Sequence, residues 1–266
     1  MRLFKKIGLT LGSLLLAGSL AACGGGTSPT PSGDQAEGGA DSPAQDVVNI
    51  KLAHTGSEEH QYHIGATHFK EIIEEKSGGT IQIEIFPNAQ LGSEKDATEG
   101  VINGTIDMAV VAADSSPANI VPELNVFGIP YIFKDREHVY SVLDGEIGKS
   151  ILAKVDEKGM KGLGFWEIGF RNVTTNNKAI VNPEDMNGLK IRVQPSPVWQ
   201  AHMKALGANP TPVDFNELYS ALEQGVVDGQ ENPIATIMSM KFYEVQKNIA
   251  LTEHTYSPAI VLMSNK

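Results

Sequence analysis

Short apolar runs alternate with amphipathic stretches from Val47 onward, and this alternation restricts the chain to the α/β fold class. The pattern predicts five elements in the order strand, helix, strand, helix, strand: residues 47–53, 61–76, 80–86, 94–103 and 106–112. Ser93 can cap the second helix, and Gly104 follows its end. This order predicts a parallel sheet with its ligand at the carboxyl ends of the strands.

The pattern restarts near Gly169, which indicates a second domain. Four further strands are predicted at residues 174–175, 190–193, 248–252 and 259–263. Asp214–Glu217 is interpreted as a capping box that opens a helix through Gln224, and Asp228-Gly229 is interpreted as a turn. We therefore expect one domain formed by residues 47–168 together with 258–266, and a second formed by residues 169–257.

Residues 1–23 have the features of an export signal. Three cations near the start precede an apolar run, which is shorter than the roughly 20 residues of a membrane-spanning helix. The run ends at Leu20-Ala21-Ala22-Cys23-Gly24, which resembles a bacterial lipobox. We expect Cys23 to be acylated and to become the mature N-terminus. Because Cys23 is the only cysteine of the chain, an intrachain disulfide and a thiol active site are excluded.

Residues 24–46 are rich in Gly, Ser, Thr, Pro and acids, which predicts a disordered tether between a lipid anchor and the folded part. The expected location is the outer face of the cytoplasmic membrane, or the periplasm. Removal of the signal with its three cations would change the formal net charge from −11 to −14. This acidity argues against nucleic acid as a partner. The net negative charge of the protein repels an anionic ligand, so such a ligand would need arginines at its binding site.

The histidines near the first helix form the one cluster that could hold a metal. The cluster contains His54, His60, His63 and His68, together with Glu58 and Glu59. Its spacing does not match a tetrahedral zinc site, so we predict no metal. The sequence also lacks a complete nucleotide-binding motif and a Gly-x-Ser-x-Gly elbow, so we predict no cofactor. His54, which closes the first strand, is of more interest as a cleft residue.

Two arginines stand within or beside apolar, strand-like sequence. Arg171 ends the run Phe165–Phe170, and Arg192 lies inside Leu189–Val193. A buried guanidinium costs several kcal/mol of desolvation unless it is paired, and its planar fork fits a carboxylate. Either arginine could bind a ligand carboxylate, or could instead form a structural ion pair with a local acid such as Glu167. The sequence is compatible with both interpretations.

Five ordered segments carry a resemblance to a known family: Gly188–Val193, Ala205–Pro212, Glu217–Leu222, Asp228–Pro233 and Lys241–Val245. Upstream, Phe86–Gly92 and Gly104–Asp107 match as well. Over nearly all of residues 47–266 the chain resembles the solute-binding proteins of tripartite ATP-independent periplasmic (TRAP) transporters.

The resemblance implies a non-enzymatic binding protein with two α/β domains that close on a ligand cleft. The ligand would be a small organic-acid anion, either a four-carbon dicarboxylate or a sugar acid such as a uronate, and the partner would be the membrane permease. Arg192 matches the arginine that clamps the ligand carboxylate. The resemblance assigns further ligand contacts to Arg171, Asn232 and Phe215, and variable pocket positions to Trp166, Glu167, His54, Thr55 and Asp114.

Members of this family continue beyond the point that matches Lys266, so we expect the chain to be C-terminally truncated. Two other functions are compatible with parts of the sequence. The first is a lipoprotein that presents its ligand to a sensor kinase. The second is a secreted hydrolase or lyase with Glu167 or Asp114 as the base, although the sequence offers no recognisable nucleophile or metal set.

Overall fold

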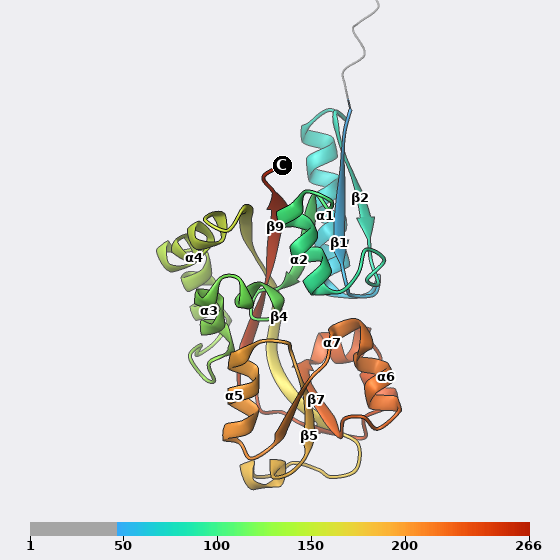
Figure 1. Cartoon of the computed structure of the whole chain (residues 1–266), viewed down its shortest axis with the longest axis vertical. Helices are drawn as coiled ribbons and strands as arrows, with labels where there is room; N and C mark the ends of the chain where they lie inside the picture. Colours follow the sequence, from blue (N-terminus) through green and yellow to red (C-terminus); the bar gives the residue numbers. More distant parts are fainter. Residues whose placement is uncertain (1–46) are drawn as a thin grey trace, which may run out of the picture. The chain divides into compact units, whose positions relative to one another are not determined.

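The computed structural model describes residues 47–266 (Figure 1). The predicted signal, the acylated Cys23 and the tether at 24–46 lie outside the described residues. Among the helices of residues 47–266, none combines the length and the apolarity that crossing a bilayer requires.

The first five elements confirm the predicted strand–helix order. They are β1 (Val48–His54), α1 (Gln61–Lys76), β2 (Ile81–Phe86), α2 (Glu94–Asn103) and β3 (Met108–Ala112). β1 pairs in parallel with β2 and with β3. β1 therefore lies between them, and its last residues, with Leu52 paired to Met108 and His54 to Val110, sit at the carboxyl edge of the sheet.

The ends of α2 follow from local chemistry. The Ser93 side chain accepts from the backbone N–H of Asp96, and the Asp96 carboxylate accepts from the backbone N–H of Ser93. This capping box satisfies donors that the first turn leaves free. Gly104 ends the helix with φ 77°, a left-handed conformation that glycine adopts without a steric penalty. The predicted boundaries of this helix are confirmed.

Two long antiparallel strands connect the two parts of the sheet. β4 (Met160–Thr175) and β9 (Tyr256–Ser264) pair with each other, and β9 also pairs with β3. Figure 1 shows both strands running from the elements near α2 toward those near α5. The strand order is β2-β1-β3-β9-β4-β7-β5-β6, with β8 paired to β4. The predicted strand at 174–175 is thus only the end of a 16-residue strand.

The second part of the sheet contains β5 (Lys190–Val193), β6 (Asn209–Pro212), β7 (Gly229–Pro233) and β8 (Asn248–Ala250). Its helices are α5 (Pro197–Ala205), α6 (Leu218–Glu223) and α7 (Ile234–Ser239). The predicted turn at Asp228-Gly229 is wrong for Gly229, because that residue pairs with Thr175 as the first residue of β7. Asp228 supports this arrangement, since its carboxylate accepts from the backbone N–H of Lys190.

The predicted capping box at Asp214–Glu217 is also wrong. Phe215–Glu217 is a 3-10 turn, the Asp214 side chain makes no cap hydrogen bond, and α6 begins only at Leu218. The preceding carbonyl of Val213 accepts a hydrogen bond from Arg192 Nε, which ties this segment to β5. The other 3-10 turns are Ser116–Asn119, Pro122–Gly128, Pro183–Met186 and Phe242–Glu244.

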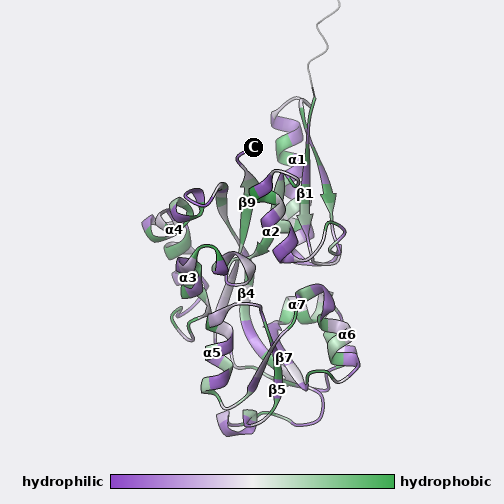
Figure 2. Cartoon of the chain, in the orientation of Figure 1, coloured by the Kyte–Doolittle hydropathy of each residue, from purple (hydrophilic) through white to green (hydrophobic). Residues whose placement is uncertain are grey.

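Helices α3 (Arg136–Leu143) and α4 (Glu146–Asp156) were not among the predicted elements. In Figure 2, α4 and α5 carry both hydrophilic and hydrophobic residues, whereas β9 is largely hydrophobic. The hydropathy of these elements matches their solvent exposure. The first seven residues of β9 are buried, and α4 buries Ile151 and Val155 on one face. The core of the first part of the sheet therefore lies around β3, β9 and β4.

The division into two domains stays a prediction. Both proposed boundaries, 168/169 and 257/258, fall inside continuous strands, since β4 and β9 pass through them without interruption. Pairing changes at these places: residues 160–170 of β4 pair with β9, and residues 171–175 pair with β7 and β8.

Candidate functional site

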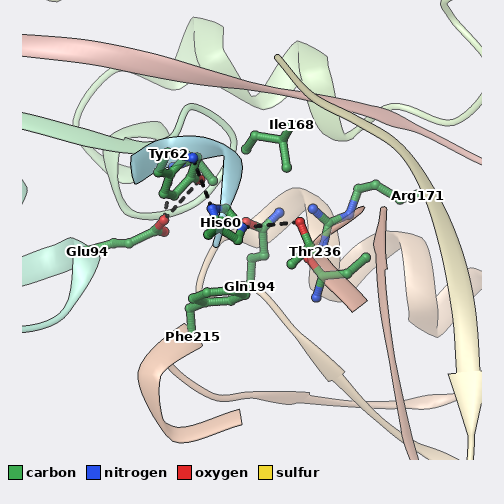
Figure 3. Close-up of a pocket in the computed structure, with 10 residues that line it drawn as sticks. His60, Tyr62, Glu94, Ile168, Arg171, Gln194, Phe215 and Thr236 are labelled. Atoms are coloured by element: carbon green, nitrogen blue, oxygen red, sulfur yellow. Dashed lines mark hydrogen bonds between the residues drawn. The ribbon is translucent and has the colours of Figure 1, made fainter. Parts of the chain in front are cut away.

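A small enclosed cavity lies where the two parts of the sheet meet (Figure 3). Its volume is about 10 Å3, which is room for about one water molecule. The lining residues come from α1, α2, β3, β4, β7 and α7 and from the segments after β5 and β6: His60, Tyr62, Glu94, Ala112, Ile168, Arg171, Gln194, Phe215, Asn232 and Thr236. Most of these side chains are polar, although the cavity is buried.

Arg171 is held by Glu231 in a buried ion pair. Arg171 Nη2 donates to Glu231 Oε1 at 2.9 Å, to the Glu231 carbonyl at 2.7 Å and to Asn232 Oδ1 at 3.1 Å. Nε donates to the second carboxylate oxygen, and Nη1 donates to Ser257 Oγ at 3.3 Å. The side chain also lies 4.9 Å from the centre of the Trp199 ring. Arg171 thus has an internal acid, and this acid is Glu231 and not Glu167.

Strand pairing explains the contact between Arg171 and Glu231. In the β4–β7 register, Arg171 lies opposite Pro233 and Val173 lies opposite Glu231. Arg171 and Glu231 are therefore diagonal neighbours on one face of the sheet, within reach of a long side chain. Burial alone would raise the pKa of Glu231, but the charge and hydrogen bonds of Arg171, together with the His254 ring whose Nε2 lies 3.4 Å from Glu231 Oε2, outweigh it and lower this pKa to about 2. The pair is therefore ionised near neutral pH.

Arg192 differs from Arg171 because it has no carboxylate partner. Its side chain is 1% exposed, its Nε donates to the Val213 carbonyl at 2.8 Å, and its buried Nη1 has no hydrogen-bond partner among the described residues. Burial, opposed by Glu231 and reinforced by the Arg171 charge, lowers the pKa of Arg192 to about 10. Arg192 does not itself line the cavity, but it lies on β5 two residues before the lining residue Gln194, and the charges that act on it include those of the lining residues Arg171 and Glu94. A buried cation with a free hydrogen-bond donor favours the binding of an anion.

Asp114 is buried and orients Gln194. One Asp114 carboxylate oxygen accepts from Gln194 Nε2 at 3.1 Å, and the other accepts from Ser257 Oγ at 2.6 Å. The Asp114 carbonyl accepts from Ser196 Oγ. Burial raises the pKa of the Asp114 carboxyl. These bonds connect Asp114, which follows β3, to the end of β5, so Asp114 joins the two parts of the sheet and does not itself line the cavity.

Seven of the ten lining residues were not predicted as ligand contacts, and three of them, Tyr62, Glu94 and Thr236, hold hydrogen bonds at the cavity. Glu94 Oε1 accepts from the backbone N–H of Ala112 at 3.0 Å and from the Tyr62 hydroxyl at 3.5 Å. Thr236 Oγ1 accepts from Gln61 Nε2 at 3.0 Å and lies 3.3 Å from His60 Nε2. None of these residues stands in a recognisable motif, and only the fold brings α1, α2 and α7 together.

His60 was considered only as a metal ligand, and the structure gives it a different place. Its Nδ1 accepts from the backbone N–H of Tyr62, so it caps α1. Burial lowers the pKa of His60 to about 3, so the ring is neutral near pH 7. Among residues 47–266, no group of three or more His, Cys, Asp or Glu side chains is arranged to hold a metal ion.

His54 and Thr55 are buried beside the cavity but do not line it. His54 Nε2 lies 3.1 Å from His63 Nδ1, and burial lowers the pKa of His54 to about 4. His54 Nδ1 and Thr55 Oγ1 have no hydrogen-bond partner within the described part of the chain. Two buried polar atoms without partners are unusual, but neither residue lines the cavity, so the predicted ligand role of both stays a prediction.

Phe215 and Asn232 line the cavity. The Phe215 ring lies edge-on to His60, with ring centres 5.9 Å apart. Asn232 Nδ2 donates to Gln230 Oε1 at 2.6 Å, while Asn232 Oδ1 accepts from Arg171. The structure therefore brings these two side chains and Arg171 to the same cavity.

Trp166 and Glu167 lie outside the cavity. The Trp166 ring packs on α1 at Gly65, where a Cβ atom would lie 2.9 Å from Trp166 Cε3. Glu167 accepts from Arg136 Nε at 2.8 Å and from the Tyr140 hydroxyl, in a neighbouring groove of about 320 Å3. Since neither side chain lines the cavity, their positions lend no support to a ligand role there.

Comparisons with known proteins show which family the chain is similar to. The sequence model of the family described as "Bacterial extracellular solute-binding protein, family 7" matches residues 52–266. The chain is 37% identical over 216 residues to the 2,3-diketo-L-gulonate-binding periplasmic protein of Escherichia coli, covering 81% of this chain and 66% of that relative. It spans about two thirds of the length of that curated relative.

Two solved structures show how similar the folds are. A TRAP periplasmic solute-binding protein from Polaromonas sp. JS666, bound to D-erythronate, has a TM-score of 0.80 and 40% identity, covering 82% of this chain and 71% of the other. A second TRAP periplasmic solute-binding protein, from Sulfurospirillum deleyianum, with bound succinate, has a TM-score of 0.79 and 39% identity, covering 82% and 70%.

Proposed function

Because the chain belongs to family 7 of the bacterial extracellular solute-binding proteins, we propose that it captures a small organic-acid anion and delivers it to a TRAP membrane permease. Members of this family are binding proteins and not enzymes. The rival interpretation as a hydrolase or lyase finds no support in the site, since Glu167 is engaged by Arg136 and Asp114 by Gln194 and Ser257.

One observation carries the proposal: Arg192 is a buried cation with a free Nη1 donor and no carboxylate partner among the described residues. Leaving such a group unpaired is costly, and an incoming carboxylate removes this cost with charge-assisted hydrogen bonds. Arg171 has a different role in the proposal. Since Glu231 already neutralises it, Arg171 holds Asn232 in place and contributes at most a residual donor to the ligand.

Binding would require the cavity to widen. A volume of about 10 Å3 holds no four-carbon acid. The contacts that close the cavity join separate elements, since Gln61 and His60 of the first part reach Thr236 of the second, and Asp114 reaches Gln194. We propose that these contacts open to admit the ligand and close over it, so that the ligand stabilises the closed arrangement.

For the location, we propose an extracytoplasmic site of action with acylation at Cys23 as the anchor and residues 24–46 as the tether. The support is the sequence pattern of this segment and the membership of a family of periplasmic solute-binding proteins. Metabolic labelling with a palmitate analogue, with Cys23→Ser as the control, tests the anchor.

The test of the binding role is calorimetric titration of the full chain with sugar acids and four-carbon dicarboxylates. Replacing Arg192 by Ala removes the free donor and its charge, so we expect Kd to rise at least about tenfold, in line with about 1.5–3 kcal/mol for a charge-assisted bond. Lys190→Ala is the matched control, because Lys190 is an exposed cation on the same strand. Equal affinities of wild type and Arg192→Ala would contradict the proposal.

A further inference from the structure

A buried acid, Glu94, lines the cavity of the candidate site and is 7% exposed. We propose that Glu94 takes up a proton when a carboxylate ligand binds next to Arg192, so that binding of the organic acid is coupled to binding of a proton. This inference rests on the binding role proposed above and assigns a function to a further residue of the same site.

The buried charges leave one cation for two anions once a ligand has entered. Glu231 already neutralises Arg171, whose Nε and Nη2 both donate to the Glu231 carboxylate. Arg192 is the other buried arginine of residues 47–266, and the Glu94 charge acts on it. A ligand carboxylate at Arg192 therefore competes with Glu94 for the same counter-charge. Two carboxylates that share one cation raise each other's pKa, and the one with the weaker contact to the cation takes the proton.

The hydrogen bonds of Glu94 accommodate this proton without rearrangement. Glu94 Oε1 accepts from the backbone N–H of Ala112 at 3.0 Å and from the Tyr62 hydroxyl at 3.5 Å, a contact that Figure 3 marks. Both hydrogen bonds reach the same oxygen, so a proton on Oε2 leaves them intact. The neutral carboxyl is also a donor to a ligand oxygen, whereas the ionised carboxylate only accepts.

The charge on Glu94 depends on whether Arg192 is free. Burial raises the pKa of Glu94, and the Asp114 charge adds to this rise. Hydrogen bonds from Ala112 and Ser115 oppose the rise, and so does the Arg192 charge. A ligand carboxylate paired with Arg192 cancels that charge, so the pKa of Glu94 rises further in the complex. The titratable groups on the elements around Glu94 are His54 of β1, His60 and Tyr62 of α1, Asp114 after β3, Arg171 of β4, Arg192 of β5, Asp214 after β6, Glu231 of β7 and Tyr256 of β9.

Asp114 and His60 are the other groups near the cavity that could take the proton. Each Asp114 oxygen already accepts a hydrogen bond, from Gln194 Nε2 at 3.1 Å and from Ser257 Oγ at 2.6 Å, so a proton would displace one of these donors. Asp114 also does not line the cavity. Burial lowers the pKa of His60 to about 3, so its ring stays neutral near pH 7. Glu94 is therefore the group that responds to the ligand.

The coupling gives the affinity a pH dependence with a defined sign. Because the pKa of Glu94 is higher in the complex than in the free protein, the complex binds more protons between these two values. Kd is lowest below the pKa of Glu94 in the free protein. It rises by up to about tenfold per pH unit until the pKa of Glu94 in the complex is passed.

The experiment counts protons by isothermal titration calorimetry of the full chain with D-erythronate. Titrations at the same pH in PIPES and in imidazole, which differ in ionisation enthalpy, give the number of protons taken up per ligand bound. We expect a maximum of at least about 0.5 proton between about pH 6 and pH 7.5, and a Kd that rises at least about threefold per pH unit there. D-galacturonate or succinate takes the place of D-erythronate if that acid does not bind.

A variant tests whether Glu94 carries the proton. In Glu94→Gln the side chain keeps an acceptor for the Ala112 N–H but does not ionise, so it resembles the protonated acid. Proton uptake should fall below about 0.1 per ligand, and at pH 7.5 the variant should bind at least about threefold more tightly than the wild type. A merely structural role of Glu94 predicts weaker binding instead. Glu99→Gln is the matched control, because it makes the same charge change at an exposed position of α2, and it should keep the wild-type uptake.

The outcomes separate this inference from the binding role. If an acid binds the wild type through Arg192 without proton uptake at any pH, the inference is overturned and the binding role stands. If uptake persists in Glu94→Gln, another group carries the proton and the assignment to Glu94 is wrong. If Glu94→Gln does not fold, the proton count of the wild type still decides whether binding is proton-coupled. If none of the three acids binds, the binding role and the inference both fail.

Discussion

The buried ion pair between Arg171 and Glu231 allows a sharp test of the structure, through replacement of Glu231 by Gln. The side chains are 2% and 0% exposed, so removing the carboxylate charge leaves a guanidinium buried without its counter-ion. Breaking a buried pair in this way costs about 3–5 kcal/mol. The lowered pKa of Glu231 points in the same direction. Its fall from an ordinary 4.5 to about 2 corresponds to about 3 kcal/mol of stabilisation of the ionised form.

The two figures agree, so we expect Glu231→Gln to lower the free energy of unfolding by about 3 kcal/mol. For a folded part of this size, Tm should fall by about 6–12 °C. Urea denaturation followed by circular dichroism measures the change, and Glu223→Gln, an exposed position at the end of α6, is the matched control. A loss below about 1 kcal/mol would refute the argument, because it would mean that Arg171 finds another partner or is hydrated.

The same pair predicts a pH dependence with a defined sign. The folded pKa of Glu231 lies below its unfolded value, so the unfolded state binds more protons between the two values. The stabilisation is therefore complete above about pH 4.5 and is lost as the pH falls toward 2. In Glu231→Gln this part of the acid destabilisation should be absent.

Two further predictions concern stability. Ser93→Ala removes the side chain that caps α2 through the Asp96 N–H, and should cost about 1 kcal/mol in urea denaturation, whereas no loss would mean that the capping box is not formed in solution. Burial lowers the pKa of His60 to about 3 and those of His54 and His202 to about 4, so the unfolded state binds more protons below pH 6.5 and stability falls on acidification. Between pH 8 and pH 5 the free energy of unfolding should fall by at most about 2 kcal/mol for each of these histidines. NMR titration of the folded protein measures their pKa values, and resonances of these three histidines that titrate near 6.5 would contradict the prediction.

The sequence predicted the local elements of the first sheet well, because their signals are short-range. The helix at 61–76 follows from apolar spacings of three and four residues, and Ser93 was predicted as the cap of the next helix; both are confirmed. The pair Asp228-Gly229 was misinterpreted as a turn, since its composition is typical of one. Gly229 instead begins the buried strand β7, because β4 and β5 on either side satisfy the backbone and side chains of that strand.

The residues of the candidate site were also predicted only in part. The assignment of Arg192 rested on a local motif, Gly188–Val193, and the structure gives this arginine a free donor. The partner of Arg171 could not be found from spacing, because Glu231 lies 60 residues away and meets it only through the β4–β7 register. Trp166 and Glu167 were predicted beside the ligand, but their orientation depends on irregularities in the pairing of β4 with β9 that the sequence does not reveal.

By itself, then, the sequence determined the α/β class, the ends of α1 and α2 and the position of a buried arginine on β5, since periodicity and capping depend on neighbouring residues. The tertiary structure alone decided which acid neutralises Arg171, and that His60, Glu94 and Thr236 share a cavity with it. The physical reason is that side chains distant in the sequence come into contact only when strand register and helix packing are fixed. These contacts set the charge balance of the site.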